Sequence, residues 1–106
     1  MDYHAHIYWR TPEERETALS LQFQLQEWGC KIGRVWDQPI GPHPLPMYQA
    51  LYDSSTAPLV EDFLSKYRGT NSILLHESIL DDLRDHTEGT RWLGSPLELK
   101  LDFFKQ

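Results

Sequence analysis

The chain opens with a segment in which apolar and polar positions alternate. Residues 3–9 read Tyr-His-Ala-His-Ile-Tyr-Trp, and their aromatic, alternating character predicts a β-strand. Successive side chains of a strand point to opposite faces, so Ala5, Ile7 and Trp9 share one face while His4 and His6 share the other. We expect the apolar face to pack against helices and the two histidines to point away from them.

Two later segments have helical spacing. In the first, Thr11 can act as the N-cap, Pro12 suits the first helical position and Glu14 completes a capping box. Apolar residues then recur every three or four positions as far as Trp28, before Gly29. The second predicted helix covers residues 59–67 and ends near Gly69.

Further strands are predicted over residues 31–36, 47–53 and 72–76. Between the first two of these, residues 38–46 contain four prolines and a glycine, which predicts a stiff loop holding His43. A short polar helix is predicted from Ser78 through Thr87. The alternation of leucines and phenylalanine with charged residues over 97–103 predicts a half-buried final strand.

The order β-α-β-β-α-β indicates an α+β protein with a ferredoxin-like sandwich, followed by a short helix and an extra strand. We predict that strands 3–9 and 47–53 form a central parallel pair, with strand 72–76 antiparallel beside strand 3–9. Both helices then cover one sheet face and leave the other open. At 106 residues we expect a single domain spanning 1–106, and a homodimer that covers part of the open face.

Composition narrows the possible functions. The net charge of −6 argues against a general nucleic-acid binder, because an acidic surface repels phosphate backbones. The single cysteine, Cys30, excludes an internal disulfide and a multi-thiolate zinc site. No apolar run reaches the length of a membrane span, and the first residues do not resemble a signal peptide. We therefore expect a cytoplasmic protein with no membrane partner.

The predicted topology brings four of the five histidines to one edge of the sheet. His76 ends a strand antiparallel to 3–9, which places it near His4 and His6. His43 lies just before strand 47–53, which the parallel pairing would start at the same edge. A His-x-His pair on a strand can offer two nitrogens to one metal ion, and His76 and His43 can supply a third ligand and a fourth ligand or supporting group. Without thiolates, Fe(II), Zn, Ni and Mn all remain possible.

Five motifs follow one another along the chain: Tyr-His-Ala-His-Ile-Tyr at 3–8, Gly-Pro-His-Pro-Leu-Pro-Met-Tyr at 41–48, Leu-His at 75–76, Asp-Asp-Leu-Arg-Asp-His-Thr at 81–87 and Trp-Leu-Gly-Ser-Pro-Leu at 92–97. In this order and spacing they resemble the motifs of the fungal-type DOPA 4,5-dioxygenase family. The resemblance runs from residue 3 to about 101. The Gly-Pro-His-Pro segment and the Asp-His-Thr to Trp-Leu-Gly segment are the most specific. One departure is Glu77, where the family commonly has proline; Glu77 is either a carboxylate near the metal or a local substitution.

The resemblance implies extradiol cleavage of a DOPA-like catechol by O₂ at a non-haem metal, most often Fe(II), with Zn or Ni as alternatives in purified protein. It implies His6, His43 and His76 as metal ligands. His86, in the Asp-His-Thr motif, and His4 are then the candidate catalytic proton carriers. A ligand set that includes a carboxylate and an all-histidine set both remain open.

Other residues are secondary candidates. Tyr8, Tyr48 and Trp36 are either pocket-lining aromatics or ordinary core residues. Arg34 or Arg91 can pair with a substrate carboxylate, or simply be solvated. Two other functions also fit the sequence: a small α+β enzyme of another class, such as an isomerase, hydrolase or lyase, and a dimeric metal- or ligand-binding protein without dioxygenase activity. Ring-cleavage activity and metal content distinguish these alternatives.

Overall fold

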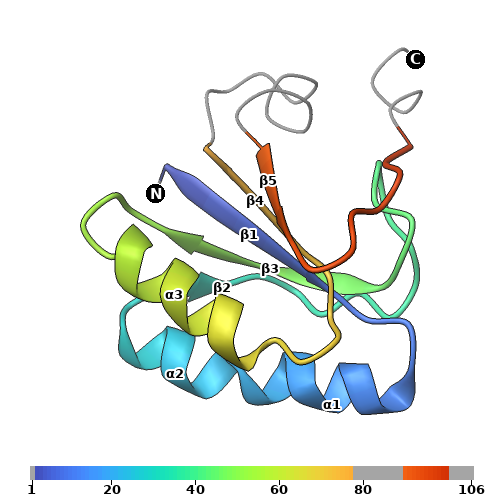
Figure 1. Cartoon of the computed structure of the whole chain (residues 1–106), viewed down its shortest axis with the longest axis horizontal. Helices are drawn as coiled ribbons and strands as arrows, with labels where there is room; N and C mark the ends of the chain where they lie inside the picture. The colour runs from blue at the N-terminus through green and yellow to red at the C-terminus, as the bar shows by residue number, and fades with distance from the viewer. Residues whose placement is uncertain (1, 78–89, 101–106) are drawn as a thin grey trace.

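The structure is a computed structural model, and it describes residues 2–77 and 90–100. A five-stranded sheet has the strand order β2-β3-β1-β4-β5, and three helices lie on one of its sides (Figure 1). The strands are β1 (Tyr3–Tyr8), β2 (Lys31–Ile32), β3 (Met47–Tyr52), β4 (Ile73–Glu77) and β5 (Thr90–Leu93), and the helices are α1 (Pro12–Ser20), α2 (Gln22–Glu27) and α3 (Ala57–Tyr67). The predicted α+β, ferredoxin-like fold is confirmed. Among the described residues, no helix is long and apolar enough to cross a membrane.

The predicted parallel pairing of the first and third strands is wrong. β1 pairs antiparallel with β3, with Tyr3 opposite Tyr52 and Tyr8 opposite Met47. The reason is geometric. The connection through α1 and α2 returns the chain so that β2 runs parallel to β1. β3 then reverses direction beside β2 and lies between β2 and β1. The antiparallel pairing of β1 with β4 agrees with the prediction.

The helices begin largely where the sequence predicts. The hydroxyl of Thr11 accepts a hydrogen bond from the backbone N–H of Glu14, as an N-cap does. The Glu14 carboxylate accepts from the backbone N–H of Arg10, one residue earlier than a capping box requires. The predicted first helix is divided in two at Leu21, and the predicted second helix begins two residues early, at Ala57.

The strand predictions need two further corrections. The segment predicted as strand 31–36 pairs as β2 only over Lys31–Ile32, followed by an isolated bridge from Trp36 to Met47. Residues 97–100 form no strand, although Leu97 and Leu99 pack against buried residues as the alternation suggests, and 101–103 lie outside the described residues. β5 instead pairs with β4 earlier in the chain. The predicted helix at 78–87 also lies outside the described residues.

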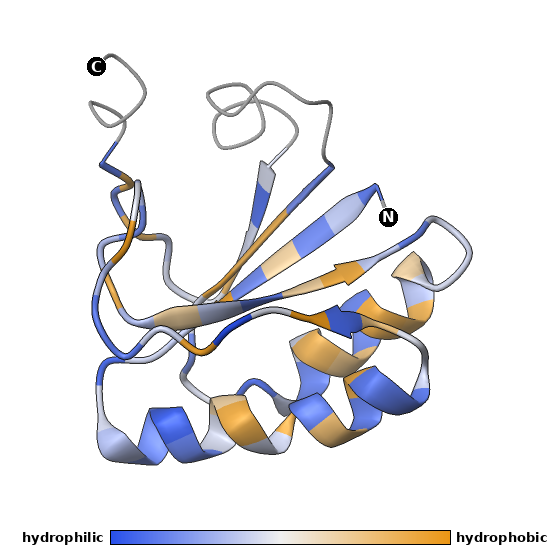
Figure 2. Ribbon diagram, turned by 180° about the vertical axis from the view of Figure 1, so that it is seen from behind, coloured by the Kyte–Doolittle hydropathy of each residue, from blue (hydrophilic) through white to orange (hydrophobic). Residues whose placement is uncertain are grey.

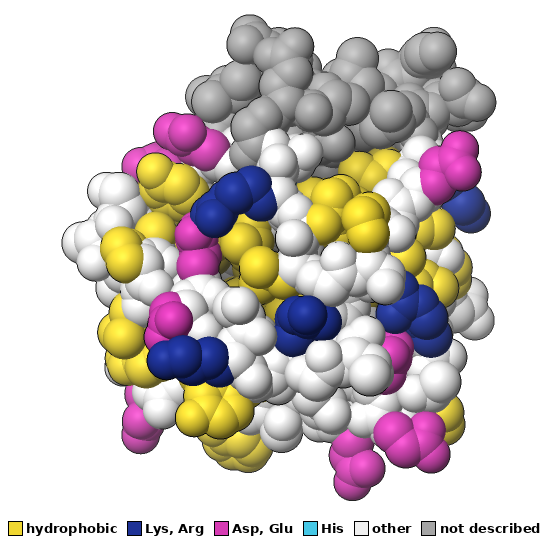
Figure 3. Space-filling view, viewed as in Figure 1, with side chains coloured by type: hydrophobic (Ala, Val, Ile, Leu, Met, Phe, Trp, Pro, Cys, Tyr) yellow, Lys and Arg dark blue, Asp and Glu magenta, His cyan; other side chains and the backbone are white. Residues whose placement is uncertain are grey.

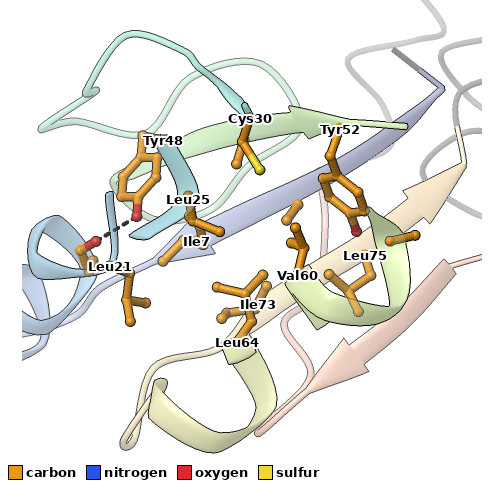
Figure 4. Packing of buried hydrophobic residues seen from close by; sticks show 14 of the residues in the cluster. Ile7, Leu21, Leu25, Cys30, Tyr48, Tyr52, Val60, Leu64, Ile73 and Leu75 are labelled. Carbon is orange, nitrogen blue, oxygen red and sulfur yellow. Dashed lines mark hydrogen bonds between the residues drawn. The ribbon is translucent and has the colours of Figure 1, made fainter. Parts of the chain in front are cut away.

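The main core fills the space between the sheet and the helices. It contains Ile7, Leu25, Val60, Leu64 and Ile73, which are fully buried (Figure 4). The strands show the matching pattern: β1 alternates between hydrophilic and hydrophobic residues, while β4 is continuously apolar before its last two residues (Figure 2). The polar positions of β1 therefore face the side of the sheet that carries no helix.

Candidate metal centre

Strand pairing brings three histidines together on the face opposite the helices. β1 and β4 are adjacent, and their register places His4 directly opposite His76. His6 lies two residues along β1 from His4 and so projects from the same face. His6 and His76 are each only 3% exposed, while His4 is half-buried. Figure 3, which looks at the molecule from one side, shows no histidine surface among the described residues.

The rings of these three residues are in direct contact range. The Nε2 atoms of His6 and His76 are 2.8 Å apart, and the two rings stack with centroids 5.0 Å apart. The His4 ring meets the His76 ring edge-on, with centroids 4.9 Å apart. Ligand-type atoms of His4, His6 and His76 all lie within 4.8 Å of one another.

The fourth predicted histidine reaches the cluster by an unexpected route. Because β3 is antiparallel to β1, its start at Met47 lies at the far end of β1 from His4. The proline-rich loop nevertheless returns across the sheet face, and the His43 ring lies with its centroid 4.4 Å from that of His6. His43 is 5% exposed, and its Nδ1 lies 2.7 Å from the hydroxyl of Tyr8. The predicted proximity of His43 is found, but the strand direction used to predict it was wrong.

The three clustered histidines fit a transition-metal ion. Two nitrogens that bind one ion at a right angle, each at about 2.1 Å, lie about 3.0 Å apart. The 2.8 Å between the Nε2 atoms of His6 and His76 is close to that value. An all-nitrogen donor set suits Fe(II), Zn, Ni and Cu, whereas Mg and Ca prefer oxygen. In the described part of the chain, the set of ligand atoms that meets this spacing comprises His4, His6 and His76 and excludes His43 and Glu77.

An apolar layer borders the cluster. Tyr8, Met47 and Leu74 are buried on the histidine face and are packed by partly buried side chains from the proline-rich loop and from residues after β5. The Tyr8 ring stacks on Trp92 with centroids 5.9 Å apart. Burial raises the pKa of the Tyr8 phenol far above its ordinary value. One end of the cluster is therefore closed from solvent by the chain's own side chains.

Several secondary candidates do not lie with the histidines. Tyr48 is buried in the core on the helix side, where its hydroxyl donates to the backbone carbonyl of Ala18. Arg91 lies opposite Leu75, on the helix side, and is paired with Glu61. The guanidinium of Arg34 lies 4.2 Å from the ring centre of Trp36, which does belong to the apolar layer. His86 lies outside the described residues.

Two further neighbours of the cluster follow only from strand register. Gln49 lies opposite His6 on β3, and Thr90 lies opposite His76 on β5. Cross-strand partners share a sheet face, so both side chains are on the histidine side. The alternation of residues 47–52 indicates which of them share a face of the strand. It identifies Gln49 as a neighbour of His6 only once the strand partner and register are known.

The sequence of the chain shows which protein family it belongs to. The model of the Dopa 4,5-dioxygenase family matches residues 3–103, nearly the whole chain. The chain belongs to the Dopa 4,5-dioxygenase family. The histidine cluster is therefore set within a dioxygenase-family fold.

The chain is also similar to individual proteins over most of its length. The chain is 33% identical to a DOPA 4,5-dioxygenase of Amanita muscaria, over 94% of this chain and 48% of that protein. It is 30% identical to an uncharacterized 21.2 kDa protein of Botryotinia fuckeliana, over 99% of this chain and 63% of that protein. The chain thus spans between about half and two thirds of these relatives. A crystal structure of a proposed dioxygenase from Nostoc punctiforme superimposes with a TM-score of 0.92 at 33% identity, covering 99% of this chain and 91% of that one.

Proposed function

We propose that this member of the Dopa 4,5-dioxygenase family cleaves the ring of a DOPA-like catechol with O₂, in the extradiol manner, using Fe(II). The observation that supports the proposal most strongly is the cluster of His4, His6 and His76, whose ligand atoms lie within 4.8 Å of one another in a dioxygenase-family fold. Zn and Ni suit the same nitrogen ligands and are alternatives in protein purified without added iron. When bound, the metal supplies Lewis acidity and holds the two reactants side by side.

The protein's own residues have three tasks in this proposal. His4, His6 and His76 hold the ion, and the pairing of β1 with β4 fixes two of them opposite one another. The buried Tyr8, Met47 and Leu74 keep water away from one end of the site. His43, whose ring lies beside that of His6, offers a ring nitrogen next to the cluster for hydrogen bonding to the substrate.

Two residues extend the proposal beyond the cluster. Arg34, stacked on Trp36 at the border of the apolar layer, is a better candidate than Arg91 to pair with a substrate carboxylate. Arg91 already pairs with Glu61 on the other side of the sheet. His86 is carried over from the family resemblance alone and is proposed as a proton carrier.

A homodimer is also part of the proposal, formed through the helices and not through the open sheet face that the sequence suggested. A patch of aromatic side chains on α2 and α3 comprises Phe23, Phe63 and Tyr67; Phe23 is 77% exposed and Tyr67 61%. Contiguous exposed aromatics on a domain of this size are typical of a protein–protein contact. A second copy of the chain is the proposed occupant.

Ring cleavage is tested with protein loaded anaerobically with Fe(II), its metal content verified, and then mixed with air-saturated catechol, 3,4-dihydroxyphenylacetate or DOPA. The expected result is a new yellow absorbance together with O₂ uptake. Protein loaded with Zn(II) and the His6→Gln variant serve as controls and should stay colourless. Bound iron without colour or O₂ uptake on any of the three catechols would reject the dioxygenase function and favour a binding protein or another class of enzyme.

A further inference from the structure

A buried hydrogen bond joins Tyr8 to His43 beside the histidine cluster. The Tyr8 hydroxyl and Nδ1 of His43 are 2.7 Å apart, Tyr8 is fully buried and His43 is 5% exposed. The His43 ring lies against that of His6, with centroids 4.4 Å apart. The bond therefore acts on a histidine that touches the proposed metal site without belonging to its closest group of ligand atoms.

The chemistry of the two groups determines the direction of this bond. A phenol has one hydrogen to donate, and a buried donor requires an acceptor. The acceptor within reach of Tyr8, among the described residues, is Nδ1 of His43. When Nδ1 accepts, a neutral imidazole carries its hydrogen on Nε2. A ring nitrogen that carries hydrogen has no lone pair for a metal, so His43 in this form is a donor and not a ligand.

Both partners are held in place by their backbones. The N–H of Tyr8 donates to the carbonyl of Ser72, and its carbonyl accepts from the side chain of Asn71 at 2.8 Å. The backbone N–H of His43 donates to the carbonyl of Ile40, and the backbone N–H of Lys100 donates to the carbonyl of Pro42. Prolines on both sides of His43 restrict the loop further. The backbones that carry the Tyr8 and His43 side chains are thus held by hydrogen bonds on both sides of the contact.

We propose that Tyr8 is a positioning residue that holds His43 as the Nε2–H tautomer, so that His43 is a hydrogen-bond donor of the site while His4, His6 and His76 hold the metal. The assignment exchanges the roles that the sequence predicted for His4 and His43. Its catalytic consequence rests on the proposed function, because the donor would serve a bound catechol. Its structural content, a tautomer and a ligand set, does not depend on ring cleavage.

The ligand set is tested by titrating Zn(II) into four proteins: wild type, His4→Gln, His43→Gln and His6→Gln. We expect His4→Gln and His6→Gln to lower the affinity by at least about tenfold, because losing a direct ligand costs no less than losing a hydrogen-bond partner that only orients one. His43 makes a ring contact with His6, with centroids 4.4 Å apart, and is not placed among the ligands. His43→Gln should stay within a few-fold of wild type. Loss of affinity in His43→Gln, with or without loss in His4→Gln, would overturn the proposal, and so would unchanged affinity in His4→Gln.

A second measurement observes the tautomer of His43 in the wild-type protein and uses variants only to assign the signals. Protein labelled with ¹⁵N at histidine and loaded with Zn(II) is examined by NMR correlations between ring nitrogens and ring protons. We expect the His43 signal, assigned by its absence in His43→Gln, to show hydrogen on Nε2, and the Tyr8 hydroxyl proton to be slow in exchange and absent in Tyr8→Phe. A His43 with hydrogen on Nδ1 and Zn(II) on Nε2 would overturn the proposal whether or not the protein cleaves catechols.

Discussion

Nε2 of His6 lies 2.8 Å from Nε2 of His76, although the two residues are 70 positions apart in the chain. The contact depends on the antiparallel pairing of β1 with β4, which also sets His4 opposite His76. Two neutral imidazoles that are buried nitrogen to nitrogen can at best form one N–H···N hydrogen bond, in which only the acceptor nitrogen uses its lone pair. A shared metal ion instead binds the lone pairs of both nitrogens. A metal ion bound between His6 and His76 should therefore stabilise the folded protein.

A bound metal should stabilise the fold through this contact. A ligand that binds only the folded state adds about 2.7 kcal/mol at a free concentration one hundred times its Kd. We expect Zn(II) to raise the Tm by several degrees, EDTA to reverse the rise, and acid to weaken it because imidazole ligands must be unprotonated. Differential scanning calorimetry with and without metal measures the effect. An equal rise in His6→Gln would show that the metal binds elsewhere.

Glu14 should make stability depend on pH in the acid range. Burial acts to raise its pKa, but hydrogen bonds from Thr70 and Arg10 outweigh burial and hold the pKa below its ordinary value of 4.5. The folded protein therefore binds this proton less readily than the unfolded chain. The stabilisation is present above the ordinary carboxyl pKa and is lost as the pH falls through the lowered one.

Urea unfolding of Glu14→Gln measures this effect. We expect a loss of about 1–3 kcal/mol near neutral pH, the range for a buried charged hydrogen bond. The difference from wild type should shrink as the pH is lowered into the acid range. Glu16→Gln, at an exposed position of the same helix, is the control and should change the free energy of unfolding by less than about 0.5 kcal/mol. A difference that does not vary with pH would contradict the assignment.

Gly94 should tolerate alanine less well than Gly29. Both have positive φ, +78° and +84°, so alanine strains the backbone at either position by about 1–2 kcal/mol. A Cβ at Gly94 would also lie 2.6 Å from Nη1 of Arg68 and 3.0 Å from the backbone oxygen of Asn71, whereas a Cβ at Gly29 meets nothing within 4 Å. We expect Gly94→Ala to lower the Tm more than Gly29→Ala. Equal losses would mean that backbone strain alone decides.

The aromatic patch on α2 and α3 should determine the oligomeric state. We expect sedimentation equilibrium to give a dimer for wild type and a monomer for Phe23→Glu, because a charge at the centre of an apolar contact cannot be solvated there. Gln26→Glu adds the same charge at another exposed position of α2 and should remain dimeric. A wild-type monomer at the highest accessible concentration would reject the homodimer.

The sequence predicts local features of this fold better than pairwise ones. Thr11 and Pro12 mark the start of α1 because capping depends on residues within one turn. The alternation in residues 3–8 correctly separates His4 and His6 from the apolar core. The direction of β3 relative to β1 is different, because it depends on which strand inserts between which others. No single segment of sequence carries that information.

In the candidate site, too, some features follow from local sequence and single strand pairings, and others do not. The nearness of His4 to His76 follows from one correct strand pairing. The position of His43 beside His6 depends on a loop that returns across the sheet. Its hydrogen bond to Tyr8 can be predicted only when the positions of both side chains are known. As an aromatic residue, Tyr48 is a candidate for either the pocket or the core, and alternation along β3 places it in the core on the helix side, while Met47 lies on the histidine side. Its place depends on register and not on residue type.

Ring opening with ¹⁸O₂ tests the central claim most directly. Protein loaded with Fe(II) is mixed with a catechol under ¹⁸O₂ and the product is examined by mass spectrometry, with His6→Gln as the matched control. An extradiol dioxygenase places both oxygen atoms of O₂ in the ring-opened product, so we expect a mass increase of two ¹⁸O atoms in wild type and no product in His6→Gln. A product without ¹⁸O, or identical incorporation in the two proteins, would contradict the account.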